Sequence, residues 1–243
     1  MRERNLVIVP TYNEADNLES LVREIMALSL DFKVLIVDDN SPDGTGQIAD
    51  RLSQENPELV SVLHRAGKLG LGTAHRAGFK WGLKRGFTRL LTMDADFSHP
   101  PSAIPEMIRR LQRAGLVIGS RYVEGGKTEG WTILRKINSW AANFLSRLLM
   151  GLKAKDTTGA FRAYRAECLE KVPLDRLKAR GYAANLEILY FIQKTGAVIE
   201  EVPIKFVNRE KGQSKISSRE VREAIKIMLY YNRLKRLDIR NIL

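Results

Sequence analysis

The sequence predicts a single α/β domain in which helices flank a mostly parallel central sheet, with amphipathic helices toward the C-terminus. Short apolar runs alternate with amphipathic stretches through the first half of the chain, as in proteins built from strand–helix–strand units. The runs are apolar throughout, which is typical of strands covered on both faces. A length of 243 residues suits one large domain with a substantial core.

The first half is expected to contain five strands separated by four helices. The strands are predicted over residues 5–11, 32–39, 59–65, 88–94 and 116–122, and the helices over 14–29, 42–56, 72–86 and 101–115. In parallel sheets, ligands bind beyond the carboxyl ends of the strands. Four acidic residues fall at these ends, namely Asp38, Asp39, Asp94 and Asp96. This edge of the sheet is therefore the expected site.

The second half begins with a helix over residues 131–152 that carries a continuous apolar stripe. A short strand (159–165), a helix (182–196), an extended edge strand (197–209) and a closing amphipathic helix (217–237) follow. The stripe has two readings. It packs as ordinary core, or it lies in a lipid interface with Trp131 and Trp140 at headgroup depth.

Composition narrows the class of protein and its partners. The net charge of +12 favours anionic partners, namely nucleic acid, phosphorylated substrates or an acidic lipid surface. Cys168 is the single cysteine, so a disulfide framework is excluded and a cytoplasmic location is the default. No apolar run approaches the roughly 20 residues of a spanning helix, so any membrane contact is expected to be peripheral.

The stretch "TMDADFSHPP" places Asp94 and Asp96 one residue apart after an apolar strand. In extended backbone these side chains share a face, and their repulsion of about 2 kcal/mol predicts a cation between them. Mg²⁺ or Mn²⁺ suits such a pair, because these ions take a few carboxylates together with water and phosphates. The alternative is a pair of carboxylates that cap the following helix. Zinc is not expected, since the three histidines lack ligand spacing.

Three motifs in the first half, "VPTYNEADNL", "IVDDNSPDGT" and "MDADFSH", resemble the signatures of GT-A glycosyltransferases of family two. The resemblance implies a GT-A fold, Rossmann-like, with the donor nucleotide in residues 1–122. It implies nucleotide contacts by Pro10, Tyr12, Glu14, Val37, Asp39, Asp94 and Ala95, and metal binding by Asp94 and Asp96. The stretch "RAGKLGLGTAHRAG" lacks the third glycine of a dinucleotide fingerprint. It resembles the Lys-x-Gly-Leu-Gly loop of the same enzymes, which implies that Lys68 lies near the nucleotide.

Four later motifs, "GSRY", "RKINS", "DTTGAFRAYR" and "NREKGQSK", resemble the dolichyl-phosphate mannose synthase branch. The resemblance implies that residues 123–243 bind the acceptor and that the apolar stripe is interfacial. The implied acceptor-phosphate ligands are Arg121, Arg135 and Ser139, which with Asp96 form the expected catalytic set. Asp156 belongs to the third motif, and Arg209 with Lys215 would hold the donor diphosphate or a closing lid. The turn over 158–162 departs from the Thr-Ser-Gly-Phe-Arg of relatives, which leaves its packing open.

The implied reaction is inverting transfer of mannose from GDP-mannose to dolichyl or another polyprenyl phosphate on the cytoplasmic face of a membrane. A UDP-glucose-dependent glucosyltransferase is the nearest alternative, and a nucleic-acid-binding protein or a catalytically inactive nucleotide-sugar sensor lies outside the class. The lipid phosphate is largely a dianion at neutral pH and needs no general base, whereas bringing two anions together needs cations. Glu187 is expected either as a third site carboxylate or as the partner of a core arginine. Whether a partner protein anchors the chain is left open.

Overall fold

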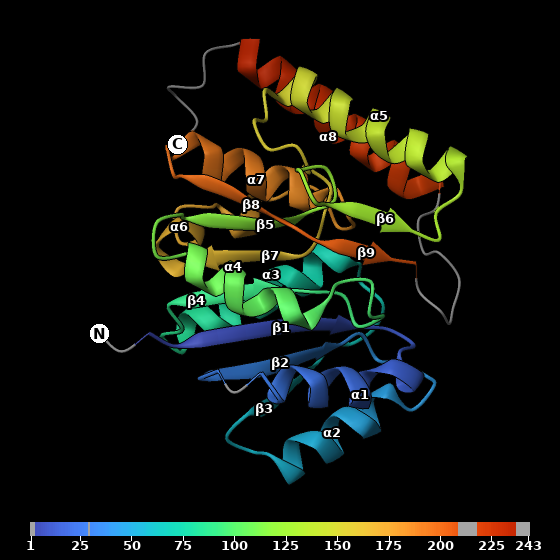
Figure 1. The fold of residues 1–243 in the computed structure, drawn as a ribbon, viewed down its shortest axis with the longest axis vertical. Coiled ribbons are helices and arrows are strands. Elements are labelled where there is room, and N and C mark those ends of the chain that lie inside the picture. The colour runs from blue at the N-terminus through green and yellow to red at the C-terminus, as the bar shows by residue number, and fades with distance from the viewer. Residues whose placement is uncertain (1–2, 29, 209–217, 237–243) are drawn as a thin grey trace.

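The computed structural model describes residues 3–28, 30–208 and 218–236, and one seven-stranded sheet runs through it (Figure 1). The strand order is β3-β2-β1-β4-β7-β5-β8. The bounds are β1 (Asn5–Thr11), β2 (Phe32–Asp38), β3 (Val60–His64), β4 (Arg89–Thr92), β5 (Leu116–Ser120), β7 (Arg162–Arg165) and β8 (Ile199–Pro203). All neighbours pair in parallel except β7, which runs antiparallel between β4 and β5. The expected mostly parallel sheet is confirmed.

Helices cover both faces of this sheet. They are α1 (Ala15–Met26), α2 (Thr45–Glu55), α3 (Leu71–Lys84), α4 (Ile104–Arg110), α5 (Ile133–Met150), α6 (Ala166–Leu169), α7 (Ala184–Lys194) and α8 (Ser218–Arg236), with 3-10 turns η1 (Pro101–Ala103) and η2 (Leu174–Arg176). Because side chains alternate along a strand, Val7 and Val9 of β1 pack under α1, α2 and α4, whereas Leu6 and Ile8 pack under α3, α7 and α8. Two apolar cores therefore hold the sheet from opposite sides, which is why its strands are apolar throughout.

The extended segment predicted over 197–209 is two strands, not one. β8 forms the edge of the main sheet, and the chain then leaves this sheet at Ile204. β9 (Lys205–Val207) pairs in parallel with β6 (Lys127–Glu129), a short strand that the sequence did not predict. This second sheet projects from the carboxyl edge of the first toward the start of α5 (Figure 1).

The helices α5 and α8 pack side by side at one end of the molecule, beyond the β8 edge (Figure 1, top). The side chains that α5 buries are Asn143, Ser146 and Met150. Its apolar stripe faces outward, with Ile133 78% exposed and Trp140 60% exposed. Burial of the stripe as ordinary core is thus wrong for this helix. Within the described ranges, no helix combines the length and apolar character needed to cross a membrane.

Candidate active site

The loop after β4 carries the two aspartates expected to bind metal. β4 ends at Thr92, so Asp94 and Asp96 lie in a bend and not on one face of extended backbone. Phe97 has φ 59°, in the left-handed region, and its backbone turns the loop back on itself. Ser98 then donates to Oδ1 of Asp96 from both its N–H (3.1 Å) and its hydroxyl (2.5 Å). The Asp96 carboxylate is therefore held in a fixed orientation.

His99 fixes the other aspartate through its backbone. The N–H of Asp94 donates to Nδ1 of His99 at 3.0 Å, and the imidazole stacks on Phe161 with ring centroids 5.1 Å apart. Burial, together with the nearby Arg121 charge, lowers the pKa of His99 to about 4 against the opposing pull of Asp96. A neutral imidazole that accepts at Nδ1 carries its proton on Nε2. The ring is thus a constant acceptor for this loop at neutral pH.

The chemistry of this loop fits a hard divalent cation. Its two carboxylates supply the oxygen ligands that Mg²⁺ and Mn²⁺ prefer. Over the ranges that the structure describes, no group of three or more His, Cys, Asp or Glu side chains is arranged to hold a metal ion. Mg²⁺ commonly binds through one or two carboxylates and completes its shell with water and substrate phosphates. A cation here would draw part of its shell from the substrate.

The expected nucleoside contacts gather at the ends of β1 and β2. The ammonium of Lys68 lies 4.2 Å from the centre of the Tyr12 ring, a cation–π contact. Asp39 accepts from the N–H of Leu69 (3.1 Å) and forms an ion pair with Arg65 (Nε–Oδ1 2.8 Å). Burial raises the pKa of Asp39 even though the Arg65 charge opposes this. Asp39 therefore connects residues 68–72, which we call the Lys68 loop, to the end of β2.

The other residues predicted at the nucleotide take more interior positions. Glu14 is 9% exposed, its carboxylate accepts from Asn17 at 3.1 Å, and it precedes α1. Pro10 is half-buried within β1. The side chains of Val37 and Ala95 are buried among the core residues. The structure places all four near the carboxyl ends of β1, β2 and β4, and their contact with a nucleotide stays a prediction.

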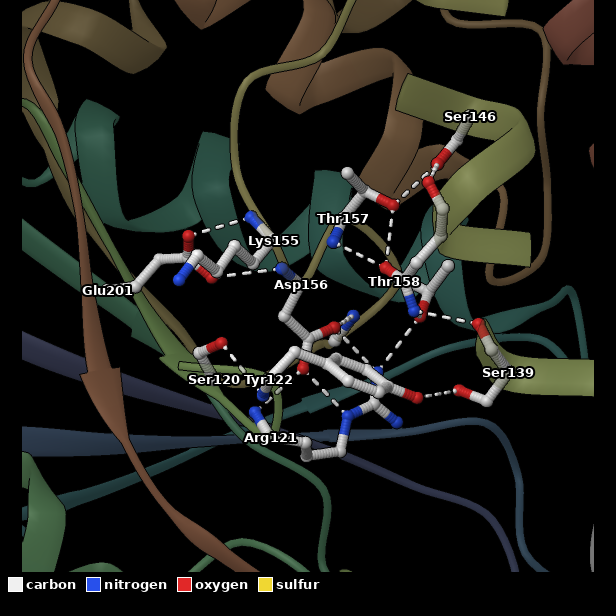
Figure 2. A network of polar contacts seen from close by, with 12 residues as sticks. Ser120, Arg121, Tyr122, Ser139, Ser146, Lys155, Asp156, Thr157, Thr158 and Glu201 are labelled. Carbon is white, nitrogen blue, oxygen red and sulfur yellow. Dashed lines mark hydrogen bonds and ion pairs between the residues drawn. The ribbon is translucent and has the colours of Figure 1, made fainter. Parts of the chain in front are cut away.

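Arg121 is held by a two-point ion pair with Asp156 (Figure 2). Its Nε donates to Oδ2 at 2.7 Å and its Nη2 to Oδ1 at 2.6 Å, while Nη2 also reaches the Thr158 hydroxyl at 2.9 Å. Burial alone would lower the pKa of Arg121, but the Asp156 charge outweighs it and the pKa is raised. For Asp156 burial is likewise overcome, and the Arg121 charge lowers its pKa. Among the described residues, the Arg121 side chain donates hydrogen bonds through Nε and Nη2 and none through Nη1.

Two of the predicted acceptor ligands, Arg121 and Arg135, meet at Trp131, and the third, Ser139, is joined to them through Tyr122, whose ring lies 5.4 Å from the guanidinium carbon of Arg121. The Trp131 ring lies 4.2 Å from the guanidinium carbon of Arg135 and 5.4 Å from that of Arg121. The Tyr122 hydroxyl donates to Oγ of Ser139 at 2.7 Å, which joins the end of β5 to α5 (Figure 2). Two cations and a hydroxyl therefore share one small region at the start of α5.

Residues that sequence reasoning missed hold the turn over 155–158. Glu201 of β8 accepts from the N–H groups of Lys155 (2.7 Å) and Asp156 (2.9 Å), as Figure 2 shows. Asn143 of α5 accepts from the N–H of Thr157 at 2.7 Å. Asn143 is one of the three side chains that α5 buries. The available signal was an asparagine, a residue of modest helix propensity, in the middle of a predicted helix.

Phe206 of β9 links the aspartate loop to the arginine pair. Its ring packs edge-on against His99 (5.5 Å between centroids) and against Trp131 (5.3 Å). Its ring also lies 5.5 Å from the guanidinium carbon of Arg121. The aspartates and the cations therefore border a single site, with one aromatic ring packed between them.

Two further expectations have different outcomes. Among the described residues Glu187 has no arginine partner and lies away from the aspartate loop: it is fully buried and accepts from the N–H groups of Lys178 and Ala179 and from the hydroxyl of Tyr231. A buried carboxylate needs such donors, and here the backbone supplies them. The predicted diphosphate ligands, Arg209 and Lys215, lie outside the described residues.

Comparison with known proteins identifies relatives over most of the chain. The polyprenol monophosphomannose synthase of Mycolicibacterium smegmatis is 44% identical over 224 residues, covering 92% of this chain and 84% of that protein. The undecaprenyl-phosphate mannosyltransferase of Micrococcus luteus is 45% identical over 222 residues, covering 91% of each.

Solved structures share the fold at lower identity. Glucosyl-3-phosphoglycerate synthase from Mycobacterium tuberculosis, solved with Mn²⁺, UDP and phosphoglyceric acid, matches with TM-score 0.69 and 19% identity over 95% of this chain and 78% of that one. The mannosyltransferase PcManGT from Pyrobaculum calidifontis, solved with GDP-Man and Mn²⁺, gives TM-score 0.57 and 17% identity over 100% and 77%. The model of glycosyl transferase family 2 matches residues 6–173. The chain belongs to glycosyl transferase family 2.

Proposed function

We propose that this protein transfers mannose from GDP-mannose to the phosphate of dolichyl or another polyprenyl phosphate. Two relatives with 44% and 45% identity, named for this class of reaction, support the assignment. The observation that carries it is the meeting of Arg121 and Arg135 at Trp131, with Ser139 joined through Tyr122, next to the aspartate loop that Phe206 contacts through His99. Family membership favours a transferase over the nucleic-acid-binding protein that the net charge alone allowed.

The acceptor residues answer an electrostatic need. A lipid phosphate with its second ionisation near pH 6 is already nucleophilic at neutral pH, so the protein has to hold it beside an anionic donor. Arg121 is oriented by Asp156 and keeps Nη1 available among the described contacts, while Arg135 is oriented by Asn208 (2.7 Å) and the Trp131 ring. Such fixed cations bind the acceptor dianion and offset its repulsion from the donor diphosphate. Attack from the side opposite the leaving diphosphate inverts the sugar carbon.

The donor residues lie on the facing loops. We assign residues 1–122 to the donor half and 123–243 to the acceptor half. Asp94 and Asp96 would hold Mg²⁺ or Mn²⁺, whose charge neutralises the donor diphosphate. The Tyr12 ring would lie beside the base, and Lys68, held over one face of that ring by its cation–π contact, would lie near the nucleotide.

We further propose that the reaction takes place on the cytoplasmic face of a membrane, to which α5 and α8 bind peripherally. Both helices expose apolar side chains, among them Leu134 and Leu148 of α5 and Leu229 of α8. Beside them, a cavity of about 520 Å³ along α8 is lined mainly by cations, namely Lys178, Arg219, Arg222 and Lys226. Apolar residues next to cations suit the boundary between acyl chains and anionic headgroups, where each cation contributes about 1 kcal/mol.

The test is transfer of labelled sugar into organic-extractable lipid. Detergent-dissolved polyprenyl phosphate is incubated with the protein and either GDP-mannose or UDP-glucose, with Mn²⁺, Mg²⁺ or EDTA. The proposal expects label from GDP-mannose alone and none in EDTA. Transfer from UDP-glucose instead would establish the rival glucosyltransferase, and transfer from neither donor would overturn the assignment.

A matched pair of α5 variants connects the reaction to the site. Arg135→Gln removes a cation from the proposed acceptor site, whereas Lys136→Gln removes the next, exposed one. We expect Arg135→Gln to reduce kcat/KM for the lipid phosphate by on the order of 100-fold, as for loss of one charge-stabilising donor. Lys136→Gln should remain within about twofold of the wild type.

A further inference from the structure

Three carboxylates hold one short backbone segment from the side of the C-terminal helix. The N–H groups of five consecutive residues, 178–182, all donate to them. The oxygens of Glu187 accept the first two, at 3.0 and 2.6 Å. Glu223 of α8 accepts the next two, at 2.9 and 3.1 Å, and Glu220 of α8 accepts the fifth at 3.1 Å. Two of the three carboxylates thus belong to α8, and the third is bound by Tyr231 of the same helix.

The Glu220 side chain occupies the space that a side chain at Gly181 would need. A Cβ atom there would lie 2.0 Å from Oε2 of Glu220, far inside contact distance. The segment is therefore seated against the first turns of α8 by its backbone, and its position follows that of the helix.

The opposite side of the segment packs on the Lys68 loop. The carbonyl of Arg180 accepts from the N–H of Thr73 at 3.3 Å. A Cβ at Gly70, whose φ is +101°, would lie 2.6 Å from that same carbonyl oxygen, and one at Gly72 would lie 2.4 Å from Cβ of Ala184. Backbone thus packs against backbone, so a shift of residues 178–182 displaces the start of α3.

The loop continues from this contact into the expected donor site. One residue before Gly70, the N–H of Leu69 donates to Asp39, and Lys68 lies over Tyr12. A continuous series of hydrogen bonds and close contacts therefore runs from α8, through residues 178–182, to the side chains expected around the nucleotide.

We propose that Glu223 and Glu220 are positioning residues for donor binding, because they fix the Lys68 loop through residues 178–182. The inference rests on the proposed function, since it takes the ligand of that loop to be a nucleoside diphosphate. α8 also exposes the apolar side chains of Val221, Ile225 and Leu229. A surface that binds α8 and a nucleotide that binds the donor site would therefore both act on residues 178–182. By reciprocity, each then changes the affinity of the other by the same factor.

The test is Glu223→Gln in the full chain, with Glu24→Gln on α1 as a control of equal charge change at an exposed position. The new amide NH₂ replaces one acceptor with a donor and opposes one backbone N–H. We expect the Kd for GDP with Mn²⁺, measured by calorimetry without lipid, to rise about tenfold, which corresponds to one charge-assisted hydrogen bond. Hydrogen exchange of the amides over 69–73 should speed up, while exchange in β1 and β2 stays as in the wild type. The donor KM should rise, and the acceptor KM should not.

Gly181→Ala provides a second variant that keeps both carboxylates and pushes Glu220 off its backbone partner. It is expected to change the same measurements in the same direction, and it carries the test if Glu223→Gln does not fold. GDP affinity within twofold of the wild type together with unchanged exchange over 69–73 overturns the inference. A wild-type protein that binds neither GDP nor UDP would instead overturn the proposed function, and the exchange comparison would still decide the link.

Discussion

Asparagine in place of Asp156 removes the charge that orients Arg121. The carboxylate is fully buried and the Arg121 side chain is 8% exposed, so the pair is largely shielded from water. The variant presents an NH₂ group to a guanidinium that stays charged, since arginine does not lose its proton in proteins. Breaking a buried pair in this way costs about 3–5 kcal/mol, compared with about 0–1 kcal/mol for an exposed pair. For a protein of this size, the melting temperature should fall by roughly 6–20 °C.

Urea unfolding at pH 7.5, followed by tryptophan fluorescence, measures this loss. Glu167→Gln is the control, because its ion pair with Arg165 (3.2 Å) is largely exposed, and it should cost less than about 1 kcal/mol. The double variant Arg121→Gln/Asp156→Asn should be more stable than Asp156→Asn alone, since no buried charge is left unpaired. A loss for Asp156→Asn as small as the control's, or a double variant that loses the sum of the two single changes, would refute the reasoning.

Three further predictions test other parts of the structure. Asp96→Asn should weaken Mn²⁺-dependent GDP binding and reduce transfer by on the order of 100-fold or more, as measured by calorimetry and by the lipid assay. Burial lowers the pKa of His75 to about 3, so below pH 6.5 the unfolded chain binds a proton that the folded protein excludes. The free energy of unfolding should therefore decrease as the pH falls below 6.5, and His75 should account for about 2 kcal/mol of that decrease at pH 5. In urea unfolding, His75→Gln should not show this part of the decrease. Leu134→Gln/Leu148→Gln should weaken binding to anionic vesicles by on the order of 100-fold in sedimentation assays, with an unchanged melting temperature.

Each of these has an outcome that would contradict it. Asp96→Asn with wild-type Mn²⁺ dependence would remove the metal from this loop. Equal pH dependence in His75→Gln and the wild type would mean that folding does not shift the pKa of the His75 ring. Vesicle binding that survives the loss of both leucines would move the membrane contact away from the exposed stripe of α5.

Local sequence predicted the parts of this fold that local chemistry decides. The apolar runs that form β1, β2, β4 and β5 were found because each is buried on both faces. Asp94, Asp96 and Asp39 were placed correctly at the carboxyl ends of their strands, because strand direction in a parallel sheet determines where strands end. The arginines of the acceptor region came from resemblance, and the structure supplied the reason that they meet, which is the Trp131 ring.

Long-range pairing was beyond the same reasoning. Nothing within "RAYR" says that β7 inserts antiparallel between two strands more than 40 residues before it in the chain. Glu187 was expected as a site carboxylate or as the partner of a core arginine, and Glu201 was not singled out, yet each accepts from backbone N–H groups. The partners of a buried carboxylate are chosen by the tertiary structure, so its role cannot be deduced from its neighbours in sequence.

The left-handed backbone of Phe97 has a consequence for how the protein balances robustness against activity. A bulky residue in that conformation costs roughly 1–2 kcal/mol, which the surrounding contacts must offset. Glycine at this position would remove the backbone strain and raise the melting temperature. It would also make the side chains of Asp94 and Asp96 more mobile before the substrate binds. Phe97→Gly should therefore give a more heat-resistant enzyme with a lower kcat. The protein gives up some stability at this loop in exchange for a fixed orientation of the aspartates.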